Sequence, residues 1–79
     1  MMKYFGSPLC PDCMEATAAL DAQGVPYEWI EITASMMNLK AFLALRDMRE
    51  EFAAVRAEGR VGIPCFLHED GKISFEIEV

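Results

Sequence analysis

Hydrophobic and polar positions follow two different periods along this chain, and glycine and proline separate the segments. A short apolar run over residues 3–6 predicts a buried strand. Residues 11–23 follow a helical period, with Pro11 at the first helical position and Gly24 after the last. Residues 27–32 are rich in aromatic and β-branched side chains, which predicts a second strand. The first half of the chain is therefore expected to form a β-α-β unit.

The middle of the chain predicts helix that does not run straight. Residues 36–58 are helical in composition, but their apolar stripe changes face, which predicts a bend near Arg46 and Asp47. Asp47 with Glu50 three residues later resembles a capping box, so a new helical start is expected there. Gly59 ends the segment. The methionines are expected to fill the core.

Two further strands are predicted at residues 63–68 and 72–79, joined at Glu69-Asp70-Gly71, whose Asp-Gly pair is typical of a hairpin. The last strand alternates strictly, which predicts an edge strand with one apolar face toward the middle helix and one solvated face. Its apolar members are Ile73, Phe75, Ile77 and Val79, and its polar members are Lys72, Ser74, Glu76 and Glu78. Its second half could instead begin a short helix. The predicted order is β-α-β-α-β-β, in a single domain over residues 1–79.

The net charge of the chain excludes two classes of expected partner. Thirteen acidic against seven basic residues give a formal net charge of −6, which argues against nucleic acid and anionic membrane surfaces. No apolar stretch approaches the roughly 18 residues of a membrane span, and residues 1–10 lack the apolar run of a secretion signal. Three cysteines, two of them three positions apart, fit reactive thiols in a reducing compartment. We therefore expect a cytoplasmic protein.

The candidate chemistry lies at Cys10-Pro11-Asp12-Cys13, between a predicted strand and the first turn of a predicted helix. Cys10 faces the unpaired N–H groups of the helix N-terminus, which favour thiolate over thiol and make it the expected attacking thiol. Cys13, one turn into the helix, is suited to resolving a mixed disulfide. Pro11 stiffens the turn, whereas the negative charge of Asp12 opposes the thiolate.

A metal site is the alternative interpretation of this cysteine pair. CxxC pairs also occur in zinc sites, and Cys65 with His68 would complete a set of three cysteines and one histidine. Residues 65 and 68 of a strand point to opposite faces, however, and a lone cysteine in an apolar run is more often buried packing. We therefore favour disulfide chemistry and expect no metal.

With Cys10-Pro11-Asp12-Cys13 and Gly62-Ile63-Pro64 in this element order, the sequence resembles the glutaredoxin branch of the thioredoxin superfamily. The resemblance implies an α/β thioredoxin-like fold of glutaredoxin type, with a four-stranded mixed sheet and a C-terminal helix that is absent or vestigial. It implies that a cis peptide bond precedes Pro64 and that the backbone of Ile63 pairs with an extended substrate. The expected catalytic residues are Cys10 and Cys13, and the expected substrate-binding residues are Pro11, Asp12, Ile63 and Pro64. The implied activity is that of a thiol–disulfide oxidoreductase that reduces protein disulfides or glutathione mixed disulfides without a bound cofactor.

The sequence departs from typical glutaredoxins in three places. Asp12 stands where they carry tyrosine, Ser7 where they often carry lysine, and residues 72–79 lack the Gly-Gly-x-x-Asp segment that holds the glutamyl end of glutathione. We therefore expect weak glutathione binding, although glutathione is a candidate electron donor beside thioredoxin reductase. The alternative function is a non-enzymatic module on the same fold that binds a metal or a partner protein through its cysteines. We expect a monomer, with dimerisation through the open sheet face as the competing state.

Overall fold

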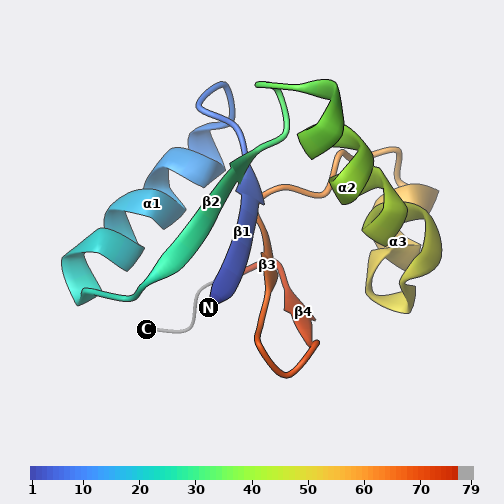
Figure 1. The fold of residues 1–79 in the computed structure, drawn as a ribbon. Helices are drawn as coiled ribbons and strands as arrows, with labels where there is room; N and C mark the ends of the chain where they lie inside the picture. The colour runs from blue at the N-terminus through green and yellow to red at the C-terminus, as the bar shows by residue number, and fades with distance from the viewer. Residues whose placement is uncertain (77–79) are drawn as a thin grey trace.

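The computed structural model describes residues 1–76, and in it a four-stranded mixed sheet lies between helices on its two faces (Figure 1). The elements are β1 (Met2–Gly6), α1 (Pro11–Gln23), β2 (Tyr27–Glu31), α2 (Met36–Met48), the 3-10 helix η1 (Glu50–Phe52), α3 (Ala53–Ala57), β3 (Cys65–Leu67) and β4 (Ile73–Ser74). The strand order is β2-β1-β3-β4; β1 and β2 are parallel, and the other two pairs are antiparallel. This is the expected β-α-β-α-β-β architecture, and no helix in residues 1–76 is long and apolar enough to cross a membrane.

The first helix forms where proline and glycine delimit it. Cys10 is its N-cap, with extended backbone at φ −102° and ψ 114°, and Pro11 occupies the first helical position. Gly24 ends the helix in the left-handed conformation, at φ 67°, and its N–H bonds to the carbonyl of Asp21. The predicted bounds 11–23 are confirmed.

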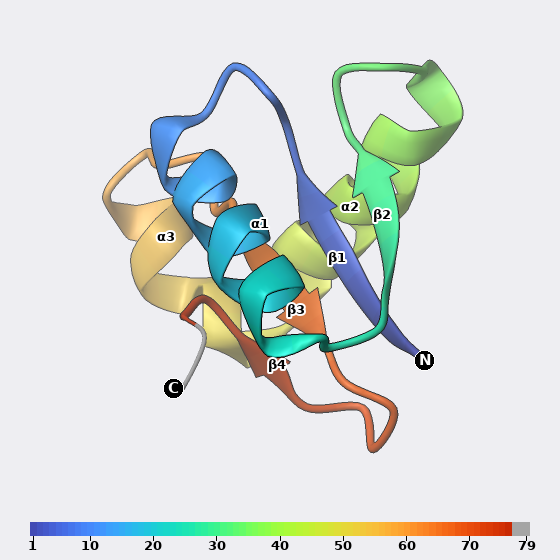
Figure 2. The same cartoon turned by 90° about the vertical axis from the view of Figure 1, so that its left-hand side faces the viewer.

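α1 covers one face of the sheet, in front of the strands in Figure 2, and packs on an aromatic layer. Tyr4, Leu20 and Phe66 are almost fully buried there. The ring of Tyr4 lies 5.4 Å from that of Tyr27 and 4.8 Å from that of Trp29, centroid to centroid. Alternate residues of a strand point to opposite faces, and Tyr4 of β1 and Tyr27 of β2 point to the face that α1 covers. Their packing against Leu20 holds α1 on the sheet.

The other face carries α2, η1 and α3 and holds the larger part of the core (Figures 1 and 2). Phe5 of β1 and Cys65 of β3 are paired neighbours in the sheet and pack toward this side. Phe42, Phe52 and Val55 close the cluster from the helices, each at most 2% exposed. Such burial supplies most of the stability of a domain this small.

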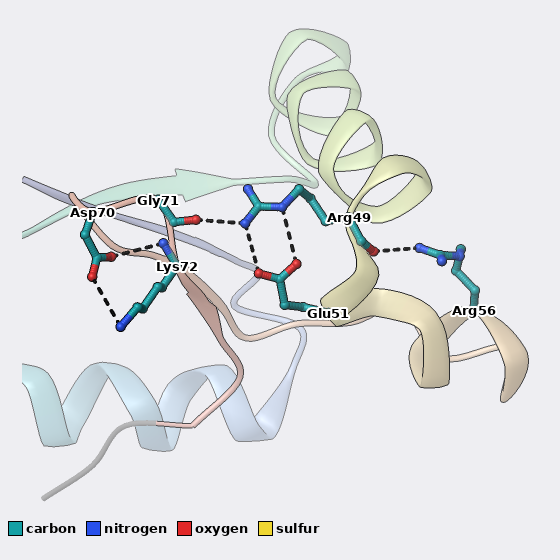
Figure 3. Close-up of polar contacts among 6 residues, drawn as sticks. All are labelled: Arg49, Glu51, Arg56, Asp70, Gly71 and Lys72. Carbon is teal, nitrogen blue, oxygen red and sulfur yellow. Dashed lines mark hydrogen bonds and ion pairs between the residues drawn. The ribbon is translucent and has the colours of Figure 1, made fainter.

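The helical segment over residues 36–58 breaks as predicted, but the break lies at Arg49, two residues after Asp47. Arg49 is extended, with φ −89° and ψ 136°. Arg56 donates to the carbonyl oxygens of Arg46 (2.6 Å) and Arg49 (3.0 Å), which gives the end of α2 the partners its own turns cannot supply. Figure 3 shows the Arg56 contact with Arg49. The predicted capping box of Asp47 and Glu50 is wrong, because η1 begins without a side-chain cap.

Arg49 also ties this break to the hairpin between β3 and β4 (Figure 3). Its guanidinium donates to the carboxylate of Glu51 (2.9 Å) and to the carbonyl oxygen of Gly71 (2.8 Å). The hairpin itself is as predicted, and Asp70 accepts from the backbone N–H of Lys72 (3.0 Å) across its turn. The break in the helix is therefore joined to the hairpin by the Arg49–Gly71 hydrogen bond.

The last strand is shorter than the predicted 72–79. β4 comprises Ile73 and Ser74, and residues 77–79 lie outside the described part of the chain. The predicted orientation holds where the chain is described, because Ile73 and Phe75 pack toward the α2 side. Phe75 is held by the ring of Phe52, 5.0 Å away, without belonging to a strand.

The methionines do not fill the core as expected. Five of them are exposed: Met1, Met14, Met36, Met37 and Met48. The core is aromatic instead, since Tyr4, Phe42, Phe52 and Phe66 are its largest fully buried side chains.

Candidate active site

Cys10 ends the loop after β1 and begins α1. Its backbone N–H donates to the carbonyl oxygen of Ser7 (3.1 Å), which closes the loop. Cys10 is partly exposed, and its Sγ accepts the backbone N–H of Cys13 at 3.3 Å. The carbonyl oxygen of Ile63 lies 4.0 Å from the same sulfur. An accessible sulfur that receives a helix N-terminal N–H suits a nucleophilic thiol.

Cys13 is fully buried one turn further along. Its Sγ shares the space above Gly6 with the ring of Trp29, because a Cβ on Gly6 would lie 3.1 Å from the sulfur and 2.9 Å from the ring. Loss of solvation on burial raises the pKa of the Cys13 thiol to about 12, and the hydrogen bond with Cys10 adds to the rise. Cys13 is therefore a neutral thiol at neutral pH, one helical turn from Cys10.

Two side chains that the sequence analysis did not single out hold this first helical turn. The hydroxyl of Tyr4 donates to the carbonyl oxygen of Cys13 at 2.6 Å, and the hydroxyl of Thr17 donates to the same oxygen at 3.0 Å. The Tyr4 bond joins β1 to α1 at the cysteine pair, whereas the Thr17 bond lies within α1. The four-residue spacing of Cys13 and Thr17 was a visible signal, whereas nothing local links Tyr4 to Cys13.

Ser7, at the position where glutaredoxins often carry lysine, is buried and hydrogen-bonded within the loop. It is 2% exposed, and its hydroxyl accepts the backbone N–H of Leu9 (3.1 Å) and pairs with the hydroxyl of Thr33 (2.9 Å). The serine therefore braces the loop that carries Cys10 against the segment after β2.

The segment from Arg60 to Pro64 faces Cys10 across the site. The peptide bond between Ile63 and Pro64 is cis, as the resemblance implied. Arg46 of α2 holds the segment from behind, because its guanidinium donates to the carbonyl oxygens of Val61 (3.0 Å) and Arg60 (2.6 Å). This role of Arg46 depends on residues 14 and 15 positions away and carries no sequence signal.

An open groove of about 960 Å³ runs between the two segments. Cys10 and Asp12 line one side, and Ile63 and Pro64 line the other. Of the predicted substrate-binding residues, Pro11 is the exception, since it is exposed at the start of α1 outside this lining. The groove gives an extended chain access to the sulfur of Cys10.

Cys65 and His68 do not join the cysteine pair. Cys65 is buried on the α2 side of the sheet, and burial raises the pKa of its thiol to about 12. The imidazole of His68 pairs with the hydroxyl of Ser74 at 2.8 Å. Within residues 1–76, no three His, Cys, Asp or Glu side chains are arranged to hold a metal ion.

Gly62 is required at the turn before Ile63. Its φ is +100°, and a Cβ there would lie 2.9 Å from the ring of Phe52. We expect Gly62→Ala to lower the free energy of unfolding by about 1–3 kcal/mol through overpacking, in addition to backbone strain. Gly59 is the matched control, because its φ is +68° but a Cβ there meets nothing within 4 Å.

Urea unfolding of both variants measures the difference. Gly59→Ala should show the strain alone, about 1–2 kcal/mol. Equal losses for the two variants would mean that Phe52 does not hold the Gly62 turn.

Stability should fall in alkaline solution. Burial raises the pKa of Cys13, Cys65 and Tyr4 to about 12 each, whereas free cysteine and tyrosine titrate near ~8.5 and ~10. Between those values and about 12 the unfolded chain releases protons that the folded chain retains, so the free energy of unfolding decreases as pH rises. Below about pH 8 this contribution is complete.

Urea midpoints at about pH 8 and pH 10.5 test this expectation. Cys65→Ala removes one of the three groups and should show a smaller decrease between the two pH values than the unsubstituted chain. A decrease that is identical in both proteins would contradict the role of Cys65 burial.

Comparison with known proteins is consistent with this geometry. The sequence model of the Glutaredoxin family matches residues 2–70, a range that contains both cysteines of the pair and Pro64. An uncharacterized protein of Haemophilus influenzae is 40% identical over 73 residues, which cover 92% of this chain and 85% of that protein. No solved structure matches the chain.

Proposed function

The chain belongs to the glutaredoxin family, and we propose that it is a thiol–disulfide oxidoreductase in which Cys10 attacks and Cys13 resolves. The observation that carries the proposal is the pairing at the start of α1. Cys10 is partly exposed and its Sγ accepts the N–H of Cys13 at 3.3 Å, whereas Cys13, one helical turn on, is fully buried. One accessible sulfur and one enclosed sulfur are what two-step disulfide exchange requires.

The proposed reaction proceeds in two exchanges. The thiolate of Cys10 attacks one sulfur of the substrate disulfide, so that a Cys10–substrate disulfide forms and the other substrate sulfur leaves as a thiol. Cys13 then attacks the Sγ of Cys10, the Cys10–substrate bond breaks, and the proton of Cys13 passes to the leaving substrate sulfur, which departs as the second thiol. The substrate gains two electrons, and the protein ends with a Cys10–Cys13 disulfide that an external thiol or dithiol must reduce.

The groove supports an extended substrate beside Cys10. Ile63 is partly exposed, and its carbonyl oxygen lies 4.0 Å from the Sγ of Cys10. Its backbone is the element that would pair with a substrate strand, with Asp12 and Pro64 beside it. Protein disulfides and glutathione mixed disulfides are the proposed substrates, and no bound cofactor takes part. The cysteine content supports a reducing compartment, the cytoplasm, and the protein is proposed to act as a monomer.

Reduction of a protein disulfide such as that of insulin tests the proposal. We expect the full chain to accelerate reduction when dithiothreitol, glutathione with glutathione reductase, or thioredoxin reductase supplies electrons, and the three arms identify the donor. Cys65→Ala is the matched control and should retain the activity. No acceleration with any donor would overturn the proposal and favour a binding module on the same fold.

Glutathione itself should bind weakly. Ser7 is buried and bonded within the loop, and Arg60, the basic side chain among the described residues that line the groove, is paired with Glu58 at 3.2 Å. The Cys10→Ser variant is used because it cannot form a mixed disulfide at that position. We expect it to bind reduced glutathione with a Kd above about 100 µM, that is, with a binding free energy weaker than about −5.5 kcal/mol. Calorimetric titration measures it, and a low-micromolar Kd would show anchors that these residues do not account for.

A further inference from the structure

We infer that the groove beside Cys10 selects disulfides in polypeptide segments that carry lysine or arginine next to the cysteine. The inference rests on the proposed function and names its substrate class. Two features of the groove support this specificity: acidic side chains line it, and exposed apolar side chains lie beside Cys10.

Three carboxylates line the groove, and they come from two parts of the chain. Asp12 and Glu15 lie three residues apart on α1, so they share one face of the helix next to Cys10. Glu76 reaches the same groove from the segment after β4. All three residues are exposed, and no lysine or arginine within residues 1–76 forms an ion pair with them.

The opposing positive charge is already engaged. Arg60 lines the groove, but its guanidinium is 3.2 Å from the carboxylate of Glu58. The charged side chains that line the groove, Asp12, Glu15, Glu76 and Arg60, therefore carry a net negative charge. Glutathione, with two carboxylates and one ammonium, is repelled by this charge, whereas a cationic segment is attracted.

The rim of the groove fits a polypeptide rather than a small cation. Leu9, in the loop beside Cys10, is 82% exposed, and Val61, before the Gly62 turn, is 56% exposed. Both side chains line the groove together with Ile63 and Pro64. Apolar side chains on either side of a reactive sulfur can contact the residues that flank a substrate cysteine.

Three short peptides test the inference. They share one central cysteine with a leucine beyond each neighbour, and the two neighbours are lysine, serine or glutamate. Each cysteine is joined to the same thionitrobenzoate group. The thiolate of Cys10 attacks the peptide sulfur, a Cys10–peptide disulfide forms, and the released thionitrobenzoate is followed by absorbance. Division by the rate with 2-mercaptoethanol removes differences in intrinsic reactivity.

At low ionic strength the reduced full chain should react roughly tenfold faster with the lysine peptide than with the glutamate peptide. The ratio should approach one near 1 M salt, where the Debye length is about 3 Å. The triple substitution Asp12→Asn, Glu15→Gln and Glu76→Gln should remove most of the ratio. Glu28→Gln should retain it, because Glu28 is exposed on β2 outside the groove. Equal rates for the three peptides at low salt would overturn the inference.

A small cationic disulfide shows whether positive charge alone is enough or whether a polypeptide is needed. The same thionitrobenzoate disulfide of cysteamine should react more slowly than the lysine peptide after the same correction, because it cannot contact Leu9 or Val61. Equal rates would overturn the assignment to polypeptides. Failure of the proposed function has a different signature, since no thionitrobenzoate would then be released from any of these compounds faster than by 2-mercaptoethanol.

Discussion

Cys10→Ser is expected to lower disulfide reduction to the uncatalysed rate, a loss on the order of 10³-fold or more. The three cysteines differ in exposure. Cys10 is partly exposed at the N-cap of α1, whereas Cys13 and Cys65 are fully buried and their thiols have pKa values raised to about 12. Neither buried thiol can substitute for the nucleophile at neutral pH. Turnover of a protein disulfide by the purified variant, beside Cys65→Ala as control, measures the loss.

Cys13→Ser should separate the two exchanges. The first step remains, so a Cys10–substrate mixed disulfide should accumulate and be seen as a mass increase of the intact protein. Glutathione can resolve this intermediate in place of Cys13, and turnover with glutathione should persist in part. Retention of activity by Cys10→Ser, or loss of both steps in Cys13→Ser, would contradict the assigned roles.

Phe52→Ala is expected to lower the free energy of unfolding by about 3–5 kcal/mol. Phe52 is fully buried, and its ring lies 5.8 Å from Phe42 and 5.0 Å from Phe75, centroid to centroid. It also packs under the turn at Gly62. Because a core of this size rarely supplies more than about 3–5 kcal/mol, the variant should be largely unfolded at room temperature.

Circular dichroism without urea, compared with urea unfolding of the unsubstituted chain, measures this loss, and Met48→Ala is the control. Met48 is 81% exposed near the same break in the helix, so its truncation should change the free energy of unfolding by no more than about 0.5 kcal/mol. A Phe52→Ala protein that remains as stable as Met48→Ala would refute the placement of Phe52 at the centre of the core.

The sequence predicted elements best where local chemistry fixes them. α1 was predicted to its residue limits, because Pro11 and Gly24 act on the backbone without help from other segments. The break after α2 was placed two residues early. Arg56 contacts the carbonyls at the break and Arg49 contacts the distant Gly71, and neither contact is visible in the local Asp47 and Glu50 pattern.

The last strand was predicted too long for a related reason. Alternation of apolar and polar residues reports which side chains are buried, not which backbone groups are paired. Phe75 is partly buried against Phe52 and so continues the alternation, although β4 ends at Ser74.

The residues of the candidate site also differ in whether the sequence alone could predict them. Cys10 and Cys13 are visible as a local motif, and Pro64 became visible through the family resemblance. The residues that hold them in place are not local. Tyr4 reaches the carbonyl of Cys13 from β1, and Arg46 reaches the segment before Pro64 from α2. Only the folded chain brings these groups together, so a single sequence carries no sign of either contact.

Redox titration with peptide mapping tests the central claim most directly. The reduced full chain is equilibrated in dithiothreitol buffers of graded potential, quenched with iodoacetamide, and digested for mass spectrometry. The account predicts one two-electron transition in which Cys10 and Cys13 lose their label together and form a disulfide with each other, while Cys65 stays reduced and is labelled only after unfolding. A chain in which Cys10 and Cys13 remain reduced at every potential, or in which the disulfide contains Cys65, would contradict it.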